Sequence, residues 1–507
     1  MRIASACKEC RSKKRRCKVR DYGPCEQCAR KGTSCSLDLG NRLPKVPAFL
    51  SPPVVQGPVE VLSTAFAIEL VDLYLELLHG KPHTLFHPSR LRQQVRESSL
   101  SDRLLYSIAG LAARFHPSPL VQSKREHYIE LAKADLKACM DDFSLATIQA
   151  CILVGHLCGA ENDRNRESLF FAVGFRIAHI VELPQPKVTD DWITREQRVR
   201  TWWSLYMTDR WSSAGLDLSK QMPDNDFVPY PMHELDFYAM DADTPAAGIE
   251  SQRIGLWAQM VRLARIFGQV RDLHKQHADG RLNNFEIEIV TARLSQDIES
   301  FVRELPPEQR IDESNLSAYA SKGLGRDLVA LHLGLHHYST LLYFPFLDSE
   351  LAECTNQALY ASQCKRSAAE LSDMLALSKR IEGCKPLYFT VAHMTVVSSS
   401  ALLHELLFGD TALLNVTRQR LNGNFETLVE LQQLWPTAEM MTDRLFAFQN
   451  MCLRSPDPNT HRADRWMVKF LLQHAMPVDE KAPEAPHSPE NARERHVNDA
   501  LSVLRRS

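Results

Sequence analysis

Six cysteines near the N-terminus are spaced as two similar halves. In each half a C-x2-C pair is followed, after six residues, by a third cysteine; the six are Cys7, Cys10, Cys17, Cys25, Cys28 and Cys35. Thiolates are strong zinc ligands, and a structural zinc ion takes four ligands in a tetrahedron, with Zn–S near ~2.3 Å. Six thiolates complete two such sites only if two of them bridge both ions. The near-repeat indicates that the two bridging ligands are the first cysteine of each half, Cys7 and Cys25.

Basic residues surround these cysteines. Residues 2–35 hold eleven Lys or Arg and three Asp or Glu, a net charge of +8, whereas the whole chain carries −2 and the remainder therefore −10. The densest run, residues 11–16, is RSKKRR, and Lys18 and Arg20 follow it. A small metal-stapled segment with concentrated positive charge, on an otherwise acidic chain, is typical of nucleic-acid binding.

Residues 7–35 resemble the fungal binuclear zinc cluster, the Zn(2)-C6 DNA-binding domain, in the six cysteines, their spacings and the basic run. The resemblance implies two Zn2+ ions. One ion would be held by Cys7, Cys10, Cys17 and Cys25, and the other by Cys7, Cys25, Cys28 and Cys35. It also implies binding to double-stranded DNA in the nucleus, with CGG-type triplets read in the major groove.

The same resemblance assigns roles to the basic residues. Lys13 and Lys14 occupy the positions that contact bases, and lysine can donate to guanine O6 and N7. The other charges are expected at phosphates, which position a protein without reading sequence; they are Arg11, Arg15, Arg16, Lys18 and Arg20. Any one of these charges could instead be a solvated side chain, and residues 13–16 would also serve as a nuclear-import signal, a role that can coexist with DNA contact.

Two other interpretations of the cysteines are open. One is a disulfide-bonded knob, although residues 1–6 lack the apolar stretch of a secretory signal and the other seven cysteines are scattered singly, as in a reducing compartment. The other is a zinc ribbon or an RNA-binding knuckle. Short helices are expected over residues 8–16 and 26–33. Helices under ~12 residues are marginal alone, so metal binding must supply the folding energy of this module.

The rest of the 507-residue chain is too long for one typical core and is predicted to be mainly α-helical. No uninterrupted apolar run approaches 18 residues, so no membrane partner is expected. The predicted divisions are a DNA-binding module (1–35), a Pro-rich linker (36–61), an all-helical domain (62–475) and a disordered tail (476–507). Five prolines in the linker preclude a long coiled coil there. The protein therefore either forms a homodimer through its helical domain or binds DNA as a monomer.

A second resemblance lies in the helical domain. Residues 194–197, TREQ, form a capping-box pattern that predicts the start of a helix. Residues 195–214 and 222–229 are similar to the regulatory (middle homology) domain of fungal transcription factors, most clearly within 62–235. Trp202 and Trp203 are expected in the core, and Asp209 and Arg210 as structural ion-pair partners. The resemblance implies regulation, with a small-molecule effector or a co-regulator as further partners.

The two resemblances together imply a sequence-specific transcription regulator of RNA polymerase II genes, acting on a secondary-metabolite or catabolic gene cluster. An enzyme is not expected, because the chain has no P-loop, G-x-S-x-G or H-E-x-x-H motif. His332 and His336 share a helix face, as the two histidines of H-E-x-x-H do. Leu333 stands where that motif has glutamate, so the two histidines are interpreted as ordinary core or surface residues without a metal. The alternative function is a zinc-dependent nucleic-acid or protein-interaction adaptor without sequence readout.

Overall fold

The computed structural model of the protein describes residues 10, 12–15, 17–18, 25–31, 35, 62–224, 227–241, 253–348, 351–454 and 458–478. The chain divides into two compact units, residues 1–61 and residues 62–507. Throughout the described ranges the regular structure is helical and contains no strand, which confirms the prediction of a mainly α-helical chain. The predicted linker at 36–61, and the predicted tail from residue 479 on, lie outside the described residues.

The second unit begins with a group of helices that runs to residue 215. They are α3 (Thr64–Leu77), α4 (Pro88–Arg96), α5 (Asp102–Ala112), η2 (Ala113–Phe115), α6 (Pro119–Ser123), α7 (Arg125–Ala138), α8 (Leu145–Ala160), α9 (Arg164–Ile180) and α10 (Trp192–Gly215). Local sequence sets several of their starts: the Ser63 side chain accepts from the N–H of Phe66, and the Asp163 side chain accepts from that of Arg166.

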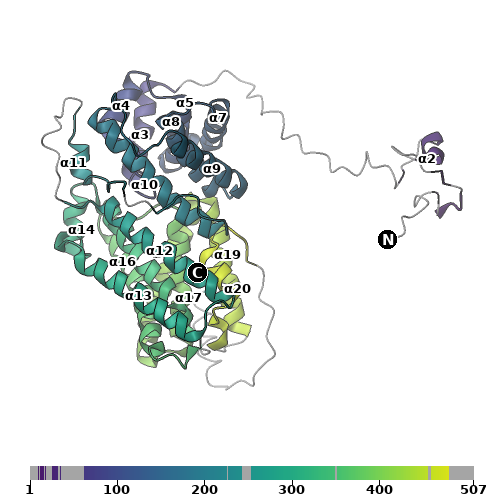
Figure 1. Cartoon of the computed structure of the whole chain (residues 1–507), viewed down its shortest axis with the longest axis vertical. Coiled ribbons are helices and arrows are strands. Elements are labelled where there is room, and N and C mark those ends of the chain that lie inside the picture. Colours follow the sequence, from purple (N-terminus) through teal and green to yellow (C-terminus); the bar gives the residue numbers. More distant parts are fainter. Residues whose placement is uncertain are drawn as a thin grey trace. The chain divides into compact units, whose positions relative to one another are not determined.

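The remaining helices follow a connection that contains α11 (Glu234–Tyr238). They are α12 (Leu256–Ala278), α13 (Asn284–Glu304), η4 (Pro307–Gln309), α14 (Glu313–Ala320), α15 (Gly325–Tyr343), η5 (Phe344–Leu347), α16 (Gln357–Arg380), α17 (Thr390–Phe408), η7 (Thr411–Leu413), α18 (Leu414–Leu434), α19 (Pro436–Arg454), η8 (Pro458–His461) and α20 (Arg465–Leu472). Figure 1 shows helices α3–α10 gathered at one end of this unit and α12–α20 at the other. Helix α10 contacts α12, and α8 contacts α19, so the two groups share one hydrophobic core.

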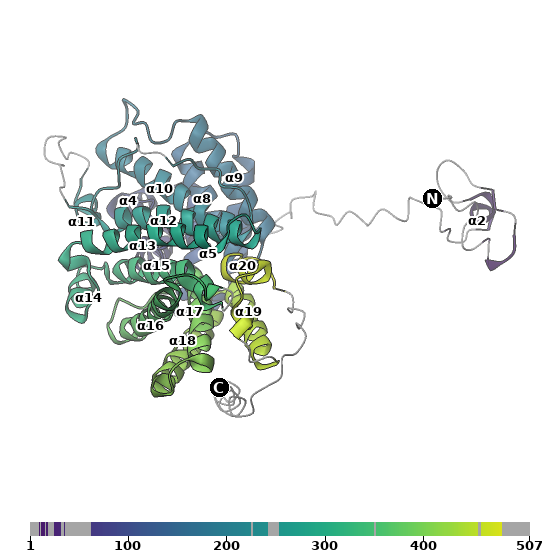
Figure 2. The ribbon, with the colours of Figure 1, turned by 60° about the horizontal axis from the view of Figure 1, so that its bottom comes forward.

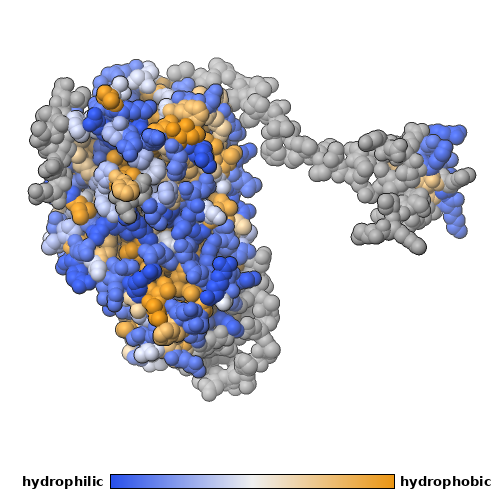
Figure 3. Space-filling view, in the orientation of Figure 1, coloured by the Kyte–Doolittle hydropathy of each residue, from blue (hydrophilic) through white to orange (hydrophobic). Residues whose placement is uncertain are grey.

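Helix α17 lies at the centre of the second group. It contacts α15, α16, α18 and α19. By length and composition it is apolar enough to cross a membrane, but 94% of its most apolar window is buried inside the protein. That combination is what the central core helix of a globular protein requires. Figure 3 shows that the face of the unit turned toward the viewer is largely hydrophilic, with separate hydrophobic patches.

The sequence pattern misplaces helix bounds in the second unit. Helix α10 begins at Trp192, two residues before the capping-box pattern, because the side chain of Asp191 accepts from the N–H of Thr194 at 2.8 Å. The guanidinium of Arg90 donates to the same carboxylate at 2.9 Å and fixes it in place. The pattern also predicts a single helix over residues 425–452, but the structure has two, α18 and α19, that meet at Trp435, because Pro436 has no N–H group with which to continue α18.

Candidate metal centre

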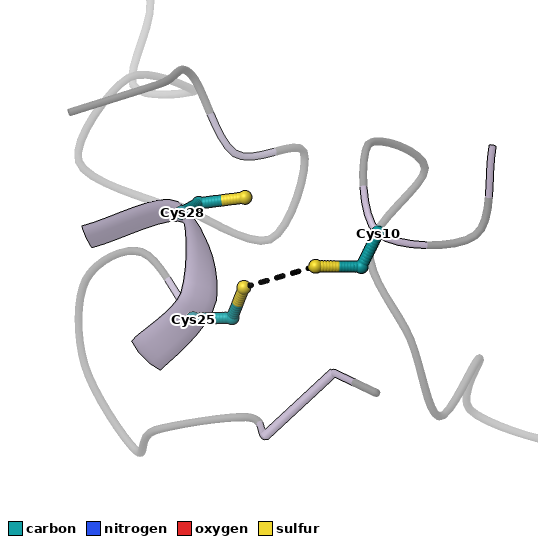
Figure 4. Close-up of side chains that lie close together, drawn as sticks. All are labelled: Cys10, Cys25 and Cys28. Atoms are coloured by element: carbon teal, nitrogen blue, oxygen red, sulfur yellow. Dashed lines mark hydrogen bonds between the residues drawn. The ribbon is translucent and has the colours of Figure 1, made fainter. Parts of the chain in front are cut away.

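Three buried cysteines from both halves of the N-terminal repeat meet in the first unit. The sulfur atoms of Cys10, Cys25 and Cys28 all lie within 4.8 Å of one another. Figure 4 shows their side chains converging, with the Sγ atoms of Cys10 and Cys25 3.7 Å apart. Two thiolates on one tetrahedral zinc ion would be about 3.8 Å apart, given Zn–S bonds near 2.3 Å. A disulfide needs about 2.05 Å, and none of the described cysteines forms one. The donor set therefore fits zinc.

Cys25 is central in this cluster. It is the residue that precedes α2 (Glu26–Arg30), and Cys28 lies one turn further along that helix. The backbone N–H of Cys25 donates to the Sγ atom of Cys35 at 3.3 Å, and Cys17 packs against the same cluster. Five of the six predicted ligands are thus brought together, whereas Cys7 lies outside the described residues.

The surroundings of Cys25 favour the thiolate, which is the ionised form of the side chain and the form that binds metal. Burial opposes ionisation, but hydrogen bonds from the Cys28 backbone N–H and from the neighbouring thiols of Cys28, Cys17 and Cys10 lower the pKa of Cys25 to about 6. The thiolate is the metal ligand, so this environment prepares the site for a cation. When bound, zinc would hold the two halves of the module together through these thiolates.

A tight turn follows Cys10 and carries the lysines predicted to contact bases. Cys10 and Ser12 are helical, whereas Lys13 and Lys14 form a turn. Lys14 has φ of 48°, and the N–H of Arg15 donates to the carbonyl oxygen of Cys10 at 2.9 Å. This is a Schellman motif, which ends a helix at a left-handed residue. The helix predicted over residues 8–16 therefore ends before Lys13, and residues 13–15 do not continue it.

The cations of this turn lie at the surface of the module. Ser12, Lys13, Lys14 and Arg15 are all exposed. The Lys18 ammonium group is also largely exposed, although it pairs with Glu26 at 3.5 Å. The remaining predicted phosphate contacts, Arg11, Arg16 and Arg20, lie outside the described residues. A scaffold held together by metal at the buried thiolates can therefore present these exposed cations to a polyanion.

In the second unit, the aromatic pair of α10 is part of the core. Trp202 and Trp203 are 3% and 0% exposed. The indole N–H of Trp203 donates to the carbonyl oxygen of Pro229 at 2.8 Å, so this side chain also holds the connection that follows α10. Neither ring lines a ligand cage in the described residues, and their packing role agrees with the interpretation from sequence.

Asp209 and Arg210 also act structurally, through a contact that the sequence pattern did not reveal. The Asp209 carboxylate accepts from the backbone N–H groups of Gln221 at 2.9 Å and Met222 at 3.0 Å, and from Arg210 at 2.8 Å. The Arg210 guanidinium in turn donates to the Met222 carbonyl and to Asp224, both at 2.9 Å. These two buried side chains, called here the α10 clamp, fasten residues 221–224 to α10.

Comparison with known families agrees with both units. Residues 71–309, which lie within the helical unit, match the fungal specific transcription factor domain. The resemblance to Zn(2)-C6 fungal-type transcription factors is confirmed by relatives that carry this name. One is the Zn(2)-C6 fungal-type transcription factor FTF1c of Fusarium oxysporum f. sp. lycopersici, which is 19% identical over 74% of this chain and 44% of its own length.

Two further relatives are transcriptional proteins. An uncharacterized transcriptional regulatory protein of Schizosaccharomyces pombe is 22% identical over 82% of this chain and 56% of its own length. The transcriptional activator protein acu-15 of Neurospora crassa is 23% identical over 60% of this chain and 32% of its own length. The chain thus spans about half, or less, of the length of these relatives.

Proposed function

We propose that this protein is a nuclear, sequence-specific DNA-binding regulator of transcription by RNA polymerase II. The observation that carries the proposal is the buried thiolate cluster beside the exposed turn at Lys13 and Lys14, in one chain with a fungal specific transcription factor domain. Two zinc ions would be held by the six N-terminal cysteines, with Cys7 and Cys25 as bridging ligands. The module would read CGG-type triplets in the major groove, and the target would be a secondary-metabolite or catabolic gene cluster.

The charge distribution supports this function over catalysis. Exposed Lys13, Lys14 and Arg15 stand together on the small module, while the part of the chain beyond residue 35 is acidic overall. Cationic side chains at phosphates supply affinity for any DNA, and donors at base edges supply the choice of sequence. The run at residues 13–16 is also proposed to direct nuclear import.

A titration with two DNA duplexes tests the function directly. We expect the full-length protein to bind a CGG-containing duplex at least about 100-fold more tightly than a scrambled duplex of equal length and composition at the same salt concentration. Fluorescence anisotropy at two salt concentrations measures both affinities. Affinity for both duplexes should fall as salt rises, because counterions are released from phosphates. Equal affinities for the two duplexes would instead support the alternative, a zinc-dependent adaptor without sequence readout.

Substitution of Lys14 separates base contact from phosphate contact. We expect Lys14→Ala to weaken binding to the preferred duplex by about 1–3 kcal/mol and to change binding to the scrambled duplex little. Because Lys14 has a positive φ, Lys14→Gly removes the side chain while keeping the turn relaxed, and it should show the same loss.

Lys31→Ala is the matched control, since Lys31 is an exposed lysine of the same module with no predicted base contact. If Lys14→Gly kept full affinity, the loss in Lys14→Ala would come from the backbone turn. An equal loss on both duplexes would place Lys14 among the phosphate contacts.

A further inference from the structure

Three neighbouring helices of the second unit enclose an open cavity of about 840 Å³. Helix α15 packs against α13 on one side and α16 on the other, and Figure 2 shows the three side by side. The lining residues of α15 lie on one stripe, from His332 through Leu335 and Ser339 to Tyr343. On α16 the lining runs from Gln363 to Arg380, about 25 Å at 1.5 Å per residue. The cavity is long, and α15 forms its floor. It is called here the α15 groove.

The middle of the α15 groove is apolar. Its walls include Val302 of α13, Leu335 of α15, and Met374 and Leu377 of α16. Val302 is 41% exposed and forms the open part of this apolar surface, whereas Leu335 and Met374, which are 5% and 4% exposed, form its base. A volume between about 300 and 1,000 Å³ with an apolar lining is the usual size and character of a site for a small organic molecule.

The two ends of the α15 groove can be told apart because its helices run antiparallel. Ser295 of α13 bonds to the Tyr343 hydroxyl at 2.8 Å, and the Cys364 thiol of α16 lies 3.5 Å from the Thr340 carbonyl oxygen. The start of α16 and the middle of α13 therefore lie beside the end of α15. The end of α16 and the segment after α13 lie beside the earlier part of α15, near His332.

Positive charge gathers at the His332 end. Arg303, Arg310 and Arg380 line the groove there, and all three side chains are exposed. The His332 ring bonds to the Gln309 carbonyl oxygen at 2.8 Å, which places the Arg310 segment against α15. Arg303 donates to a serine hydroxyl and Arg310 to backbone carbonyl oxygens. Within the ranges that the structure describes, none of the three pairs with a carboxylate.

The acidic residues of the groove are engaged elsewhere. Arg420 holds the Asp373 carboxylate through two bonds of 2.8 and 2.7 Å. Glu370 pairs with His336 at 3.1 Å. Glu299, one helical turn before Arg303 on α13, accepts from Ser295. Each of these three acids is thus bonded to another side chain, and none of them forms an ion pair with Arg303, Arg310 or Arg380 within the described residues.

The opposite end offers a hydrogen-bond acceptor. Gln363 lines this end, and its side-chain Oε1 atom is buried and accepts no hydrogen bond among the described residues. A buried acceptor left without a donor costs about 1–3 kcal/mol, so rotation of this amide toward a donor of the ligand would remove that cost.

We propose that the α15 groove binds an amphipathic organic anion. Its carboxylate would lie among Arg303, Arg310 and Arg380, and its apolar body along Val302, Leu335 and Met374. A hydroxyl or amide at the far end would donate to Gln363 in ligands long enough to reach it. This binding goes beyond the DNA-binding function and does not depend on it, because the groove lies wholly within the helical unit.

Calorimetric titration of the full-length protein with decanoate, and with uncharged 1-decanol, tests the charge. We expect saturable, one-to-one binding of decanoate, and binding of 1-decanol at least about tenfold weaker. Arg380→Ala should weaken decanoate binding by about tenfold and leave 1-decanol unchanged. Arg281→Ala is the control, since Arg281 is an exposed arginine outside the groove. Equal binding of the acid and the alcohol, or equal losses in the two variants, would overturn the proposal.

A second pair of variants tests the location. Val302→Trp should fill the groove from a partly exposed position and abolish decanoate binding. Val416→Trp makes the same change on α18, outside the groove, from a side chain of nearly equal exposure, 41% against 42%. Both variants should unfold like the parent protein. Decanoate binding that survives Val302→Trp would place the ligand elsewhere. If an acidic helical peptide bound the groove while decanoate did not, the site would be a protein-docking surface and the proposal would be wrong.

Discussion

Cys25→Ser is expected to abolish folding of the N-terminal module and its binding to CGG-containing DNA. The Sγ atom of Cys25 lies 3.7 Å from that of Cys10 and within 4.8 Å of that of Cys28. The loss of Cys25 would therefore remove a thiolate from both proposed zinc sites. Structural zinc contributes about 10–16 kcal/mol to the folding of small modules. A module of this size cannot lose that much free energy and stay folded. Native mass spectrometry of the full-length protein should count two zinc ions in the parent and none in the variant. DNA affinity should fall at least about 100-fold.

The helical unit provides an internal control for this experiment. All seven tryptophans lie at or beyond residue 192, so tryptophan fluorescence reports on that unit alone and should be unchanged in Cys25→Ser. Cys139→Ser removes a free cysteine of the helical unit and should keep both zinc ions and full DNA affinity. A Cys25→Ser protein that retained two zinc ions would show that Cys25 is not a bridging ligand. Folded, zinc-free and disulfide-linked parent protein would contradict the metal centre itself.

Asp209→Ala should destabilise the helical unit by about 3–5 kcal/mol. The substitution leaves the Arg210 guanidinium without its nearest carboxylate in a buried site, and it leaves the N–H groups of Gln221 and Met222 without their acceptor. Arg210 keeps only the exposed Asp224 as a partner. The loss of its buried partner and the unpaired Met222 N–H group together account for a cost of this size. Urea unfolding followed by tryptophan fluorescence measures the change in the free energy of unfolding.

A surface ion pair nearby gives the comparison. Asp272 pairs with Lys220 at 2.9 Å, and its side chain is 41% exposed. Asp272→Ala should cost less than about 1 kcal/mol, since solvent screens such pairs. If Asp209→Ala cost no more than Asp272→Ala, the α10 clamp would not be a determinant of stability, and the connection after α10 would be held by other contacts such as that between Trp203 and Pro229.

Local chemistry in the sequence determined the type of each unit. The spacing of six cysteines predicts zinc ligation because a C-x2-C turn and a short helix bring sulfurs together over a few residues, and Cys10, Cys25 and Cys28 do converge. The helical structure of the described ranges follows from the spacing of apolar residues along the chain, which is also a short-range property. The family resemblance in residues 195–214 was visible for the same reason, since its aromatic and charged residues share one helix.

Tertiary structure alone decided how distant side chains meet. Asp209 binds backbone N–H groups twelve and thirteen residues away, and Arg90 reaches Asp191 across 101 residues to fix the start of α10. The α15 groove joins Val302, Leu335 and Met374, which share no local pattern. Periodicity shows which face of a helix is apolar, but it does not show which other helix covers that face or leaves it open. For that reason the cysteine cluster could be predicted from the sequence, whereas the clamp and the groove could be found only in the folded chain.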